Sequence, residues 1–230
     1  MKTIASRHNP FFKRVRDAIR EHAAEIVIEG PKAVEDAIGG GWKPIAVIRR
    51  GEELTNELFD ALAGTKTSQG VIGLFERPRF AASDLFARRD AIIVALDGVQ
   101  DPGNVGTIVR LAAAFDAAGI ALLPGCADPF GPKAIRASAG AILNVPIAAV
   151  TAQELVDSGL PLFAADGAGQ AIPPPPRGAV IVFGSEGSGV SPAVRAASTP
   201  VAIATSGRVE SLNVAASAAI LLAKSYEARR

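Results

Sequence analysis

The sequence lacks most of the residues that metal or redox chemistry needs. Cys126 is the only cysteine in 230 residues, which excludes an intrachain disulfide, a paired-cysteine redox motif and a cysteine zinc cluster. Both histidines, His8 and His22, lie near the N-terminus, so the rest of the chain has no imidazole for acid–base or metal chemistry. We therefore expect a free buried thiol, no metal, and chemistry that uses other side chains.

Long hydrophobic runs are also absent. No stretch of roughly 18 or more uninterrupted apolar residues occurs, and the first residues do not lead into a signal-type hydrophobic segment. Hydrophobic residues make up 49% and charged residues 20%, as in ordinary globular proteins. Because the length exceeds a usual domain of roughly 100 to 150 residues, two unequal domains are expected. The composition predicts a soluble, cytoplasmic protein that does not bind membranes.

Positive charge is unevenly distributed rather than abundant. The formal net charge is only +1, but six of the first twenty residues are Lys or Arg and only Asp17 is acidic. Local charge governs phosphate binding, so this surplus favours a phosphate-binding surface. The alternative is a solvated helix face.

The first part of the chain is predicted to be a small α/β domain spanning residues 1–78. Hydrophobic spacing and turn residues indicate its elements. These are helix Asn9–Ala24, strand Glu25–Glu29, helix Pro31–Ile38, strand Ile45–Arg49, helix Leu54–Leu62 and strand Val71–Phe75. A mixed-charge, proline-containing stretch follows, and residues 79–90 are predicted to be a linker.

The second part, residues 91–230, alternates nearly continuous apolar runs with helical segments. Such runs are typical of parallel strands buried on both faces, so an open α/β sheet is predicted. The expected strands are Ala91–Leu96, Ile120–Leu123, Leu143–Val150, Leu162–Ala165, Ala179–Phe183 and Val201–Ala204. The expected helices are Val105–Ala118, Lys133–Ala139, Ala152–Asp157, Pro192–Ala197 and Leu212–Ala228, with Pro173–Pro176 as a non-helical surface crossing.

Three polar segments follow predicted strands, where open α/β sheets bind ligands. In the first, Asp101 to Asn104 form a turn with a good N-cap residue, and Arg110 follows within two helical turns. A capped helix with a surface arginine is the structural alternative. The third segment places Ser211, a candidate cap for the last helix, and Asn213 on either side of Leu212. Packing explains that helix but not its two polar residues.

The second segment, residues 183–191, is rich in glycine and contains Glu186. Its glycines at positions 184, 187 and 189 match neither the dinucleotide pattern nor the P-loop. No histidine is near enough in sequence to suggest a hydrolase triad. An acid among glycines can approach a ligand closely, although a solvated turn acid is an equal alternative.

Taken together, DPGNVGTIVR, FGSEGSGVS and VESLNVAASAAILL resemble, in order, the three signatures of SpoU-type (TrmH-like) ribose methyltransferases of the SPOUT class. SRHNPFFKRVRDAI, IVIEGPKAVEDAI and TKTSQGVIGLF resemble the L30e-like RNA-binding domain that many of these enzymes carry. The resemblance covers nearly the whole chain.

The resemblance implies that the C-terminal domain forms a trefoil knot and binds S-adenosylmethionine within it. It also implies a homodimer with active sites at its interface, acting on the 2′-hydroxyl of structured ribosomal RNA or, otherwise, tRNA. The implied catalytic residues are Asn104, Arg110, Glu186, Ser211 and Asn213, and the implied donor-binding residues are Gly184, Ile203, Leu212 and Asn213. The chain departs from the family at Ser185, where Asn is frequent, and at Ala204–Thr205, where a Pro–Met pair is frequent. These departures concern the shape of the donor pocket.

In this interpretation Arg110 acts as a fixed cation, because a guanidinium is a poor base, and the other polar residues orient the reactants without a metal. The RNA-binding candidates of the first domain are Arg7, Lys13, Arg14 and Arg16. One alternative is a non-catalytic dimeric RNA-binding protein with a degenerate knot. Another is a nucleotide-binding α/β enzyme of a different class, against which the glycine spacing argues.

Overall fold

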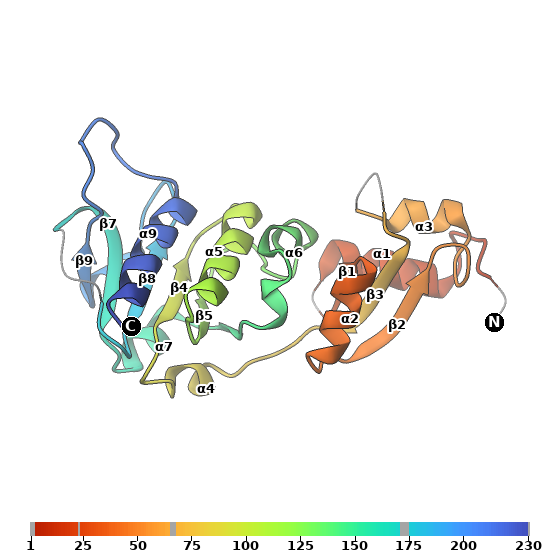
Figure 1. Cartoon of the computed structure of the whole chain (residues 1–230), viewed down its shortest axis with the longest axis horizontal. Coiled ribbons are helices and arrows are strands. Elements are labelled where there is room, and N and C mark those ends of the chain that lie inside the picture. Colours follow the sequence, from red (N-terminus) through yellow and green to blue (C-terminus); the bar gives the residue numbers. More distant parts are fainter. Residues whose placement is uncertain (1–2, 23, 65–67, 171–174, 230) are drawn as a thin grey trace. The chain divides into compact units, whose positions relative to one another are not determined.

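The computed structural model describes residues 3–22, 24–64, 68–170 and 175–229. The chain divides into two compact units (Figure 1). The first contains Met1–Pro78 together with Phe130–Ile135, and the second contains Arg79–Pro129 and Arg136–Arg230. Parts of two predictions, the end of helix Asn9–Ala24 at Ala23 and the first half of the proline run, lie outside the described residues.

The first unit is built on a three-stranded antiparallel sheet of order β1-β3-β2. Its elements are α1 (Pro10–Glu21), β1 (Glu25–Glu29), α2 (Pro31–Gly39), β2 (Pro44–Arg49), α3 (Asn56–Leu62) and β3 (Val71–Glu76). Helix α1 begins at Pro10 because the Asn9 side chain accepts a hydrogen bond from Phe11 N, and proline needs no donor there. Its buried residues Phe12, Val15 and Ala18 recur at helical spacing and pack into the core of this unit.

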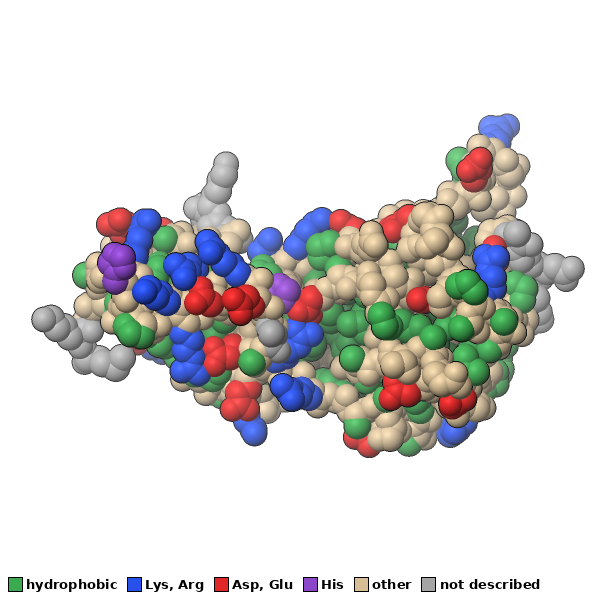
Figure 2. Space-filling model, turned by 180° about the vertical axis from the view of Figure 1, so that it is seen from behind, with side chains coloured by type: hydrophobic (Ala, Val, Ile, Leu, Met, Phe, Trp, Pro, Cys, Tyr) green, Lys and Arg blue, Asp and Glu red, His purple; other side chains and the backbone are tan. Residues whose placement is uncertain are grey.

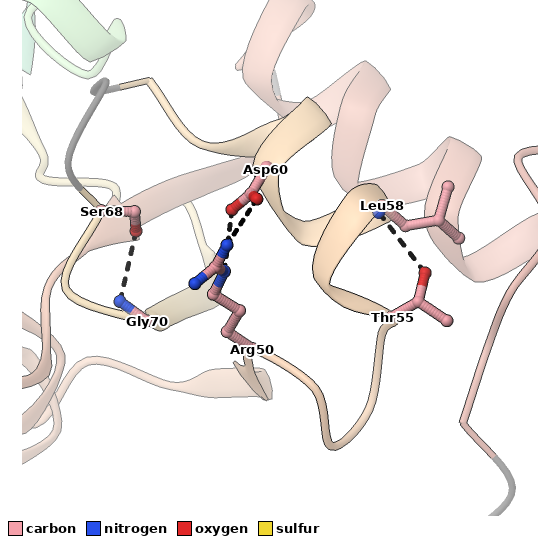
Figure 3. Close-up of polar contacts among 6 residues, drawn as sticks. All are labelled: Arg50, Thr55, Leu58, Asp60, Ser68 and Gly70. Atoms are coloured by element: carbon pink, nitrogen blue, oxygen red, sulfur yellow. Dashed lines mark hydrogen bonds and ion pairs between the residues drawn. The ribbon is translucent and has the colours of Figure 1, made fainter.

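Two local polar contacts involve residues of α3 (Figure 3). The Thr55 hydroxyl accepts a hydrogen bond from Leu58 N, which caps α3. Arg50 donates two hydrogen bonds to the Asp60 carboxylate, at 2.9 and 2.7 Å, and both side chains are about half exposed. Such an exposed pair contributes little to stability, so the buried apolar face of the helices holds this unit together.

The second unit contains a six-stranded sheet of order β6-β5-β4-β8-β7-β9, in which every neighbouring pair is parallel. Its strands are β4 (Ile93–Asp97), β5 (Gly119–Leu122), β6 (Ile147–Ala149), β7 (Leu162–Gln170), β8 (Val180–Gly184) and β9 (Ser198–Val201). Its helices are α4 (Ala82–Phe86), α5 (Pro102–Ala114), α7 (Ala152–Asp157), α8 (Pro192–Ala196) and α9 (Val214–Glu227). Helix α6 (Pro132–Ser138) is divided between the two units after Ile135. The predicted parallel α/β fold class is confirmed.

Helices cover both faces of this sheet. One face packs against α4, α7 and α8 through a continuous apolar cluster that includes Ile93, Val182 and Leu155. On the other face, α5 and α9 pack against each other and against the sheet, as the ribbon of Figure 1 shows. All five residues of β4 are buried, which explains why this strand reads as an uninterrupted apolar run.

Several predicted boundaries are wrong. The strand predicted over Leu143–Val150 shortens to β6, because residues 141–143 form a 3₁₀ helix and Pro146 has no N–H to donate to a ladder. The predicted strand Val201–Ala204 is β9, which ends at Val201, so Ile203 lies beyond the sheet. Helix α5 begins at Pro102, ahead of the predicted Val105, since Asp101 caps it.

Two further differences concern single residues and a segment. Ser211 does not cap the last helix; Asn213 does, and α9 starts at Val214. The predicted linker over residues 79–90 contains α4, whose Leu85 and Phe86 are buried against the sheet. Its two apolar side chains, rather than its charges, decide how this segment folds.

Cys126 is a free thiol, as predicted, but it is half-buried rather than buried. Its Sγ atom donates to the Leu96 carbonyl oxygen at 3.2 Å. Burial raises the pKa of this thiol. A thiol with a raised pKa stays protonated at neutral pH and is then a poor nucleophile, so we do not expect Cys126 to be reactive.

Candidate active site

The predicted polar segments follow β4, β8 and β9, and a parallel sheet brings the carboxyl ends of these strands to one edge. The first segment opens α5, the second forms a glycine loop after β8, and the third is the long connection between β9 and α9 (Figure 1). Residues far apart in the sequence therefore converge at this edge.

Three of the predicted side chains form a chain of hydrogen bonds. The Asn104 Nδ2 group donates to Glu186 Oε1 at 2.5 Å, and Asn213 Nδ2 donates to Asn104 Oδ1 at 3.2 Å. Each amide thus has its donor and acceptor directed by a neighbour. The network therefore joins one residue from each of the three segments that the sequence motifs mark.

Helix caps hold the two asparagines in place. Asp101 accepts a hydrogen bond from Asn104 N at 2.9 Å, which fixes Asn104 in the first turn of α5. Asn213 is itself the N-cap of α9, and its Oδ1 accepts from Ala215 N and Ala216 N. Because this oxygen is committed to the helix, the amide nitrogen faces Asn104.

The glycine loop after β8 is a tight turn that presents Glu186. Ser185 and Gly189 exchange two backbone hydrogen bonds, of 3.1 and 3.0 Å, and the Ser185 and Ser188 hydroxyls lie 2.7 Å apart. A Cβ atom on Gly184 would lie 2.2 Å from the backbone carbonyl carbon of Gly189, so only glycine permits this closure. Glu186 is exposed at the turn.

A buried acid secures the exit of this loop. Asp97, at the end of β4, is only 8% exposed, and its Oδ2 accepts a hydrogen bond from Ser191 N at 2.7 Å. Sequence reasoning missed Asp97. Its signal was an acid at the end of an apolar strand, where a charge must find a partner.

A cavity of about 220 Å³ opens beside the network. Three of the four residues predicted to bind the methyl donor, Gly184, Ile203 and Leu212, line it, whereas the fourth, Asn213, is not among its lining residues. Glu186 and Ser211 also line it, so the hydroxyl wrongly predicted to be a helix cap borders the cavity instead. Thr205, one of the positions that depart from the family pattern, is a further lining residue.

The cavity also contains an ion pair that the sequence did not predict. Arg195 Nη2 of α8 lies 2.8 Å from Asp166 Oδ2 of β7, and both residues line the cavity. The Asp166 side chain is 19% exposed and that of Arg195 57%. An aspartate between a strand's apolar run and a glycine was the signal available in the sequence.

Arg110 does not join the polar network within one chain. It lies in α5 six residues after Asn104, a separation of about 240° around a helix, and its side chain is exposed. The structure thus brings together Asn104, Glu186 and Asn213 but leaves Arg110 apart.

The basic residues predicted to bind RNA are more neutralised than the sequence suggested. Arg14 donates to the Glu25 carboxylate through both Nε and Nη2, which raises the pKa of Arg14. Arg16 contacts Asp17, and Arg7 lies 3.7 Å from Glu57. Figure 2 shows acidic side chains interspersed with the basic ones of this unit.

The described ranges contain no cluster of three or more His, Cys, Asp or Glu side chains arranged to hold a metal ion. Within the same part of the chain, no helix has the length and apolar character needed to cross a membrane.

Comparisons with known proteins agree with the motifs. Residues 91–223 match the model of the SpoU rRNA Methylase family. A Synechocystis protein named as an uncharacterized tRNA/rRNA methyltransferase is 31% identical over 99% of this chain and 93% of its own length. The 23S rRNA 2′-O-methyltransferase RlmP of Bacillus subtilis is 29% identical over 96% of this chain and 98% of its own.

A solved structure extends the likeness to the whole chain. The crystal structure of an AdoMet-bound rRNA methyltransferase from Sinorhizobium meliloti superposes with a TM-score of 0.89, at 27% identity, over 99% of this chain and 98% of that one. The resemblance noted from the three motifs is therefore confirmed, and this chain belongs to the SpoU family of RNA methyltransferases.

Proposed function

We propose that this protein transfers a methyl group from S-adenosylmethionine to a ribose 2′-hydroxyl of structured RNA, with ribosomal RNA as the first candidate and tRNA as the second. The observation that carries the proposal is the hydrogen-bonded network of Asn104, Glu186 and Asn213 beside a cavity lined by three of the four predicted donor-binding residues. The named activities of the Bacillus subtilis and Synechocystis relatives support it.

The cavity suits the methyl donor chemically. Ile203 and Leu212 offer apolar surface to an adenine ring, and the backbone at Gly184 allows close approach. Glu186 places negative charge near a ligand whose sulfonium is positive. When bound, the donor supplies an electrophilic methyl group.

The residues of the network position the reacting hydroxyl and need no metal to do so. Asn104 is held by Asp101 and Asn213, so its amide is fixed and can orient the ribose. The Glu186 carboxylate accepts a hydrogen bond from Asn104 and lines the cavity. It can there accept a proton from the reacting hydroxyl, or a hydrogen bond from that group. Ser211 adds a hydroxyl at the cavity wall.

Arg110 provides the positive charge that stabilises the developing alkoxide or holds a phosphate, since a guanidinium stays protonated at any working pH. Its exposed position apart from the network supports a homodimer in which the active site is completed near the interface. The predicted trefoil knot and the L30e-like identity of the first unit belong to the same proposal.

RNA binding is assigned to the first unit, chiefly through phosphate and shape contacts. Lys13 is exposed, and no ion pair of its amine occurs among the residues that the structure describes. It therefore leads the candidates Arg7, Arg14 and Arg16, whose charges are partly compensated.

The test offers the purified protein labelled S-adenosylmethionine with transcripts of ribosomal RNA and, separately, of tRNA. Label in the ribosomal transcript alone supports the preferred substrate, and label in tRNA alone would replace it. Donor binding without transfer to either RNA would favour the non-catalytic RNA-binding alternative. Sedimentation of the same sample reports whether two copies associate.

A further inference from the structure

The cavity wall also carries a pair of opposite charges, Asp166 and Arg195. Asp166 and Arg195 meet at 2.8 Å, and both face the space that the donor-binding residues surround. The aspartate is the more buried partner, at 19% exposure against 57%. Moving a carboxylate toward the interior costs desolvation free energy, which the ion pair with Arg195 helps to offset. Because Asp166 lines the cavity, its carboxylate lies beside any ligand that fills that space.

The sheet sets how far Asp166 lies from the reacting atoms. It follows Ala165, where the regular pairing of β7 with β9 is interrupted, and β8 separates β7 from β4. Neighbouring strands are about 4.8 Å apart, so Asp166 is roughly 10 Å across the sheet from the end of β4 that leads to Asn104. A ligand atom beside Asp166 would therefore lie well away from a methyl group transferred near Asn104.

The neighbouring backbone narrows this end of the cavity. A Cβ atom on Gly167 would lie 3.3 Å from the Glu210 carbonyl oxygen, so the connection before α9 closes over β7. A Cβ atom on Gly189 would lie 3.6 Å from Arg195 Nη2, so the arginine rests against the glycine loop. Arg195 is thereby placed to orient the Asp166 carboxylate.

We propose that Asp166, oriented by Arg195, binds the vicinal ribose hydroxyls of the methyl donor and so selects a ribonucleoside donor. Two adjacent O–H groups match the two acceptor oxygens of one ionised carboxylate. Dinucleotide-binding α/β folds hold a ribose hydroxyl with an acid in a comparable way. This inference rests on the proposed donor, and assigns Asp166 a binding role and Arg195 a positioning role.

The test is calorimetric binding of S-adenosylhomocysteine and of its 2′-deoxy and 3′-deoxy analogues, without RNA. In the unaltered protein each deoxy analogue binds on the order of tenfold more weakly, because a charge-assisted hydrogen bond is lost. Asp166→Ala weakens the parent compound by on the order of tenfold or more and brings the deoxy analogues level with it. Asp166→Asn keeps the size of the side chain and one acceptor oxygen, so its affinity for S-adenosylhomocysteine should lie between those of the unaltered protein and Asp166→Ala. Arg195→Ala should lose less affinity than Asp166→Ala.

A matched control removes another negative charge from the same cavity. Glu210→Gln changes the affinities of the parent and deoxy compounds by the same factor and preserves their ratio. A deoxy penalty that survives in Asp166→Ala and Asp166→Asn overturns the proposal. A second comparison uses 5′-methylthioadenosine, which lacks the amino-acid part of S-adenosylhomocysteine. If it binds the unaltered protein more weakly than S-adenosylhomocysteine but binds the variants equally well, Asp166 contacts the amino-acid end and the proposal is overturned. Failure of methyl transfer to RNA leaves this assay intact, whereas no binding of S-adenosylhomocysteine by the folded, unaltered protein rejects both proposals.

Discussion

Asn213 serves stability and chemistry through different atoms, so two substitutions separate the roles. Asn213→Ala removes the acceptor of Ala215 N and Ala216 N, at 2.9 and 3.2 Å, together with the donor to Asn104 at 3.2 Å. Loss of such a cap costs about 1 kcal/mol of unfolding free energy. Because the side chain is exposed, no cavity term adds to this figure.

Asn213→Asp keeps the cap, removes the donor and adds a negative charge. Its carboxylate accepts the same two backbone N–H groups and sits favourably at the positive end of the α9 dipole. Stability should therefore stay within a few tenths of a kcal/mol, on the order of surface substitutions generally. The methyl-transfer rate should fall by on the order of tenfold or more, because the Asn104 amide loses the group that fixes it and mispositioning slows transfer.

The assay compares urea unfolding, followed by circular dichroism, with single-turnover methyl transfer for all three proteins. The alanine variant should lose both stability and transfer rate, and the aspartate variant should lose transfer rate alone. Equal destabilisation by both substitutions would refute the capping argument. A normal transfer rate in Asn213→Asp would refute the role of the Asn213–Asn104 hydrogen bond.

Four further outcomes are expected. Arg110→Ala should abolish transfer while calorimetry shows unchanged donor affinity; an active variant would remove Arg110 from the mechanism. Lys13→Ala should weaken RNA binding and lower its salt dependence more than Arg14→Ala does, because Glu25 already compensates Arg14; filter binding at several salt concentrations decides this. Ile93→Ala, in the fully buried β4, should cost about 2–5 kcal/mol in urea unfolding, and a loss below that range would contradict the packing. Cys126, whose pKa is raised by burial, should alkylate more slowly than a free thiol at pH 8 and faster as pH rises, and rapid labelling at neutral pH would contradict its environment.

The sequence predicted the parallel sheet well because its strands are buried on both faces. A run such as that around Ile93, with no polar interruption, has few other solutions in a chain of alternating helices. Boundaries failed where apolar residues serve other purposes. Ile203 extends an apolar run but lines the cavity. Leu85 and Phe86 lie in a charged stretch yet pack in the core.

Part of the site was also predictable from local patterns. Asn104, Glu186 and Asn213 were identified individually by their motifs, and the structure shows why they belong together. Which asparagine or serine caps α9 could not be decided from sequence, because Ser211 and Asn213 are both good caps two residues apart. The Asp166–Arg195 pair depends on β7 and α8 meeting in space, which no spacing along the chain reveals.

The pairing of the basic residues of the first unit with acidic side chains was the least predictable feature. Glu25 lies eleven positions from Arg14, beyond the reach of the helical spacing rules that sequence analysis uses. A count of charges in one segment therefore overstates the free positive charge that folding leaves. Lys13 and Arg14, adjacent in sequence, consequently differ in what they can offer to a phosphate.

The most direct test of the central claim is the position of the transferred methyl group. Unmodified ribosomal RNA is incubated with labelled S-adenosylmethionine and either the unaltered protein or Asn104→Ala, digested to nucleosides and separated by chromatography with mass detection. We expect a single 2′-O-methylated nucleoside with the unaltered protein and little or none with the variant. Label on a base, or equal ribose labelling by both proteins, would contradict it.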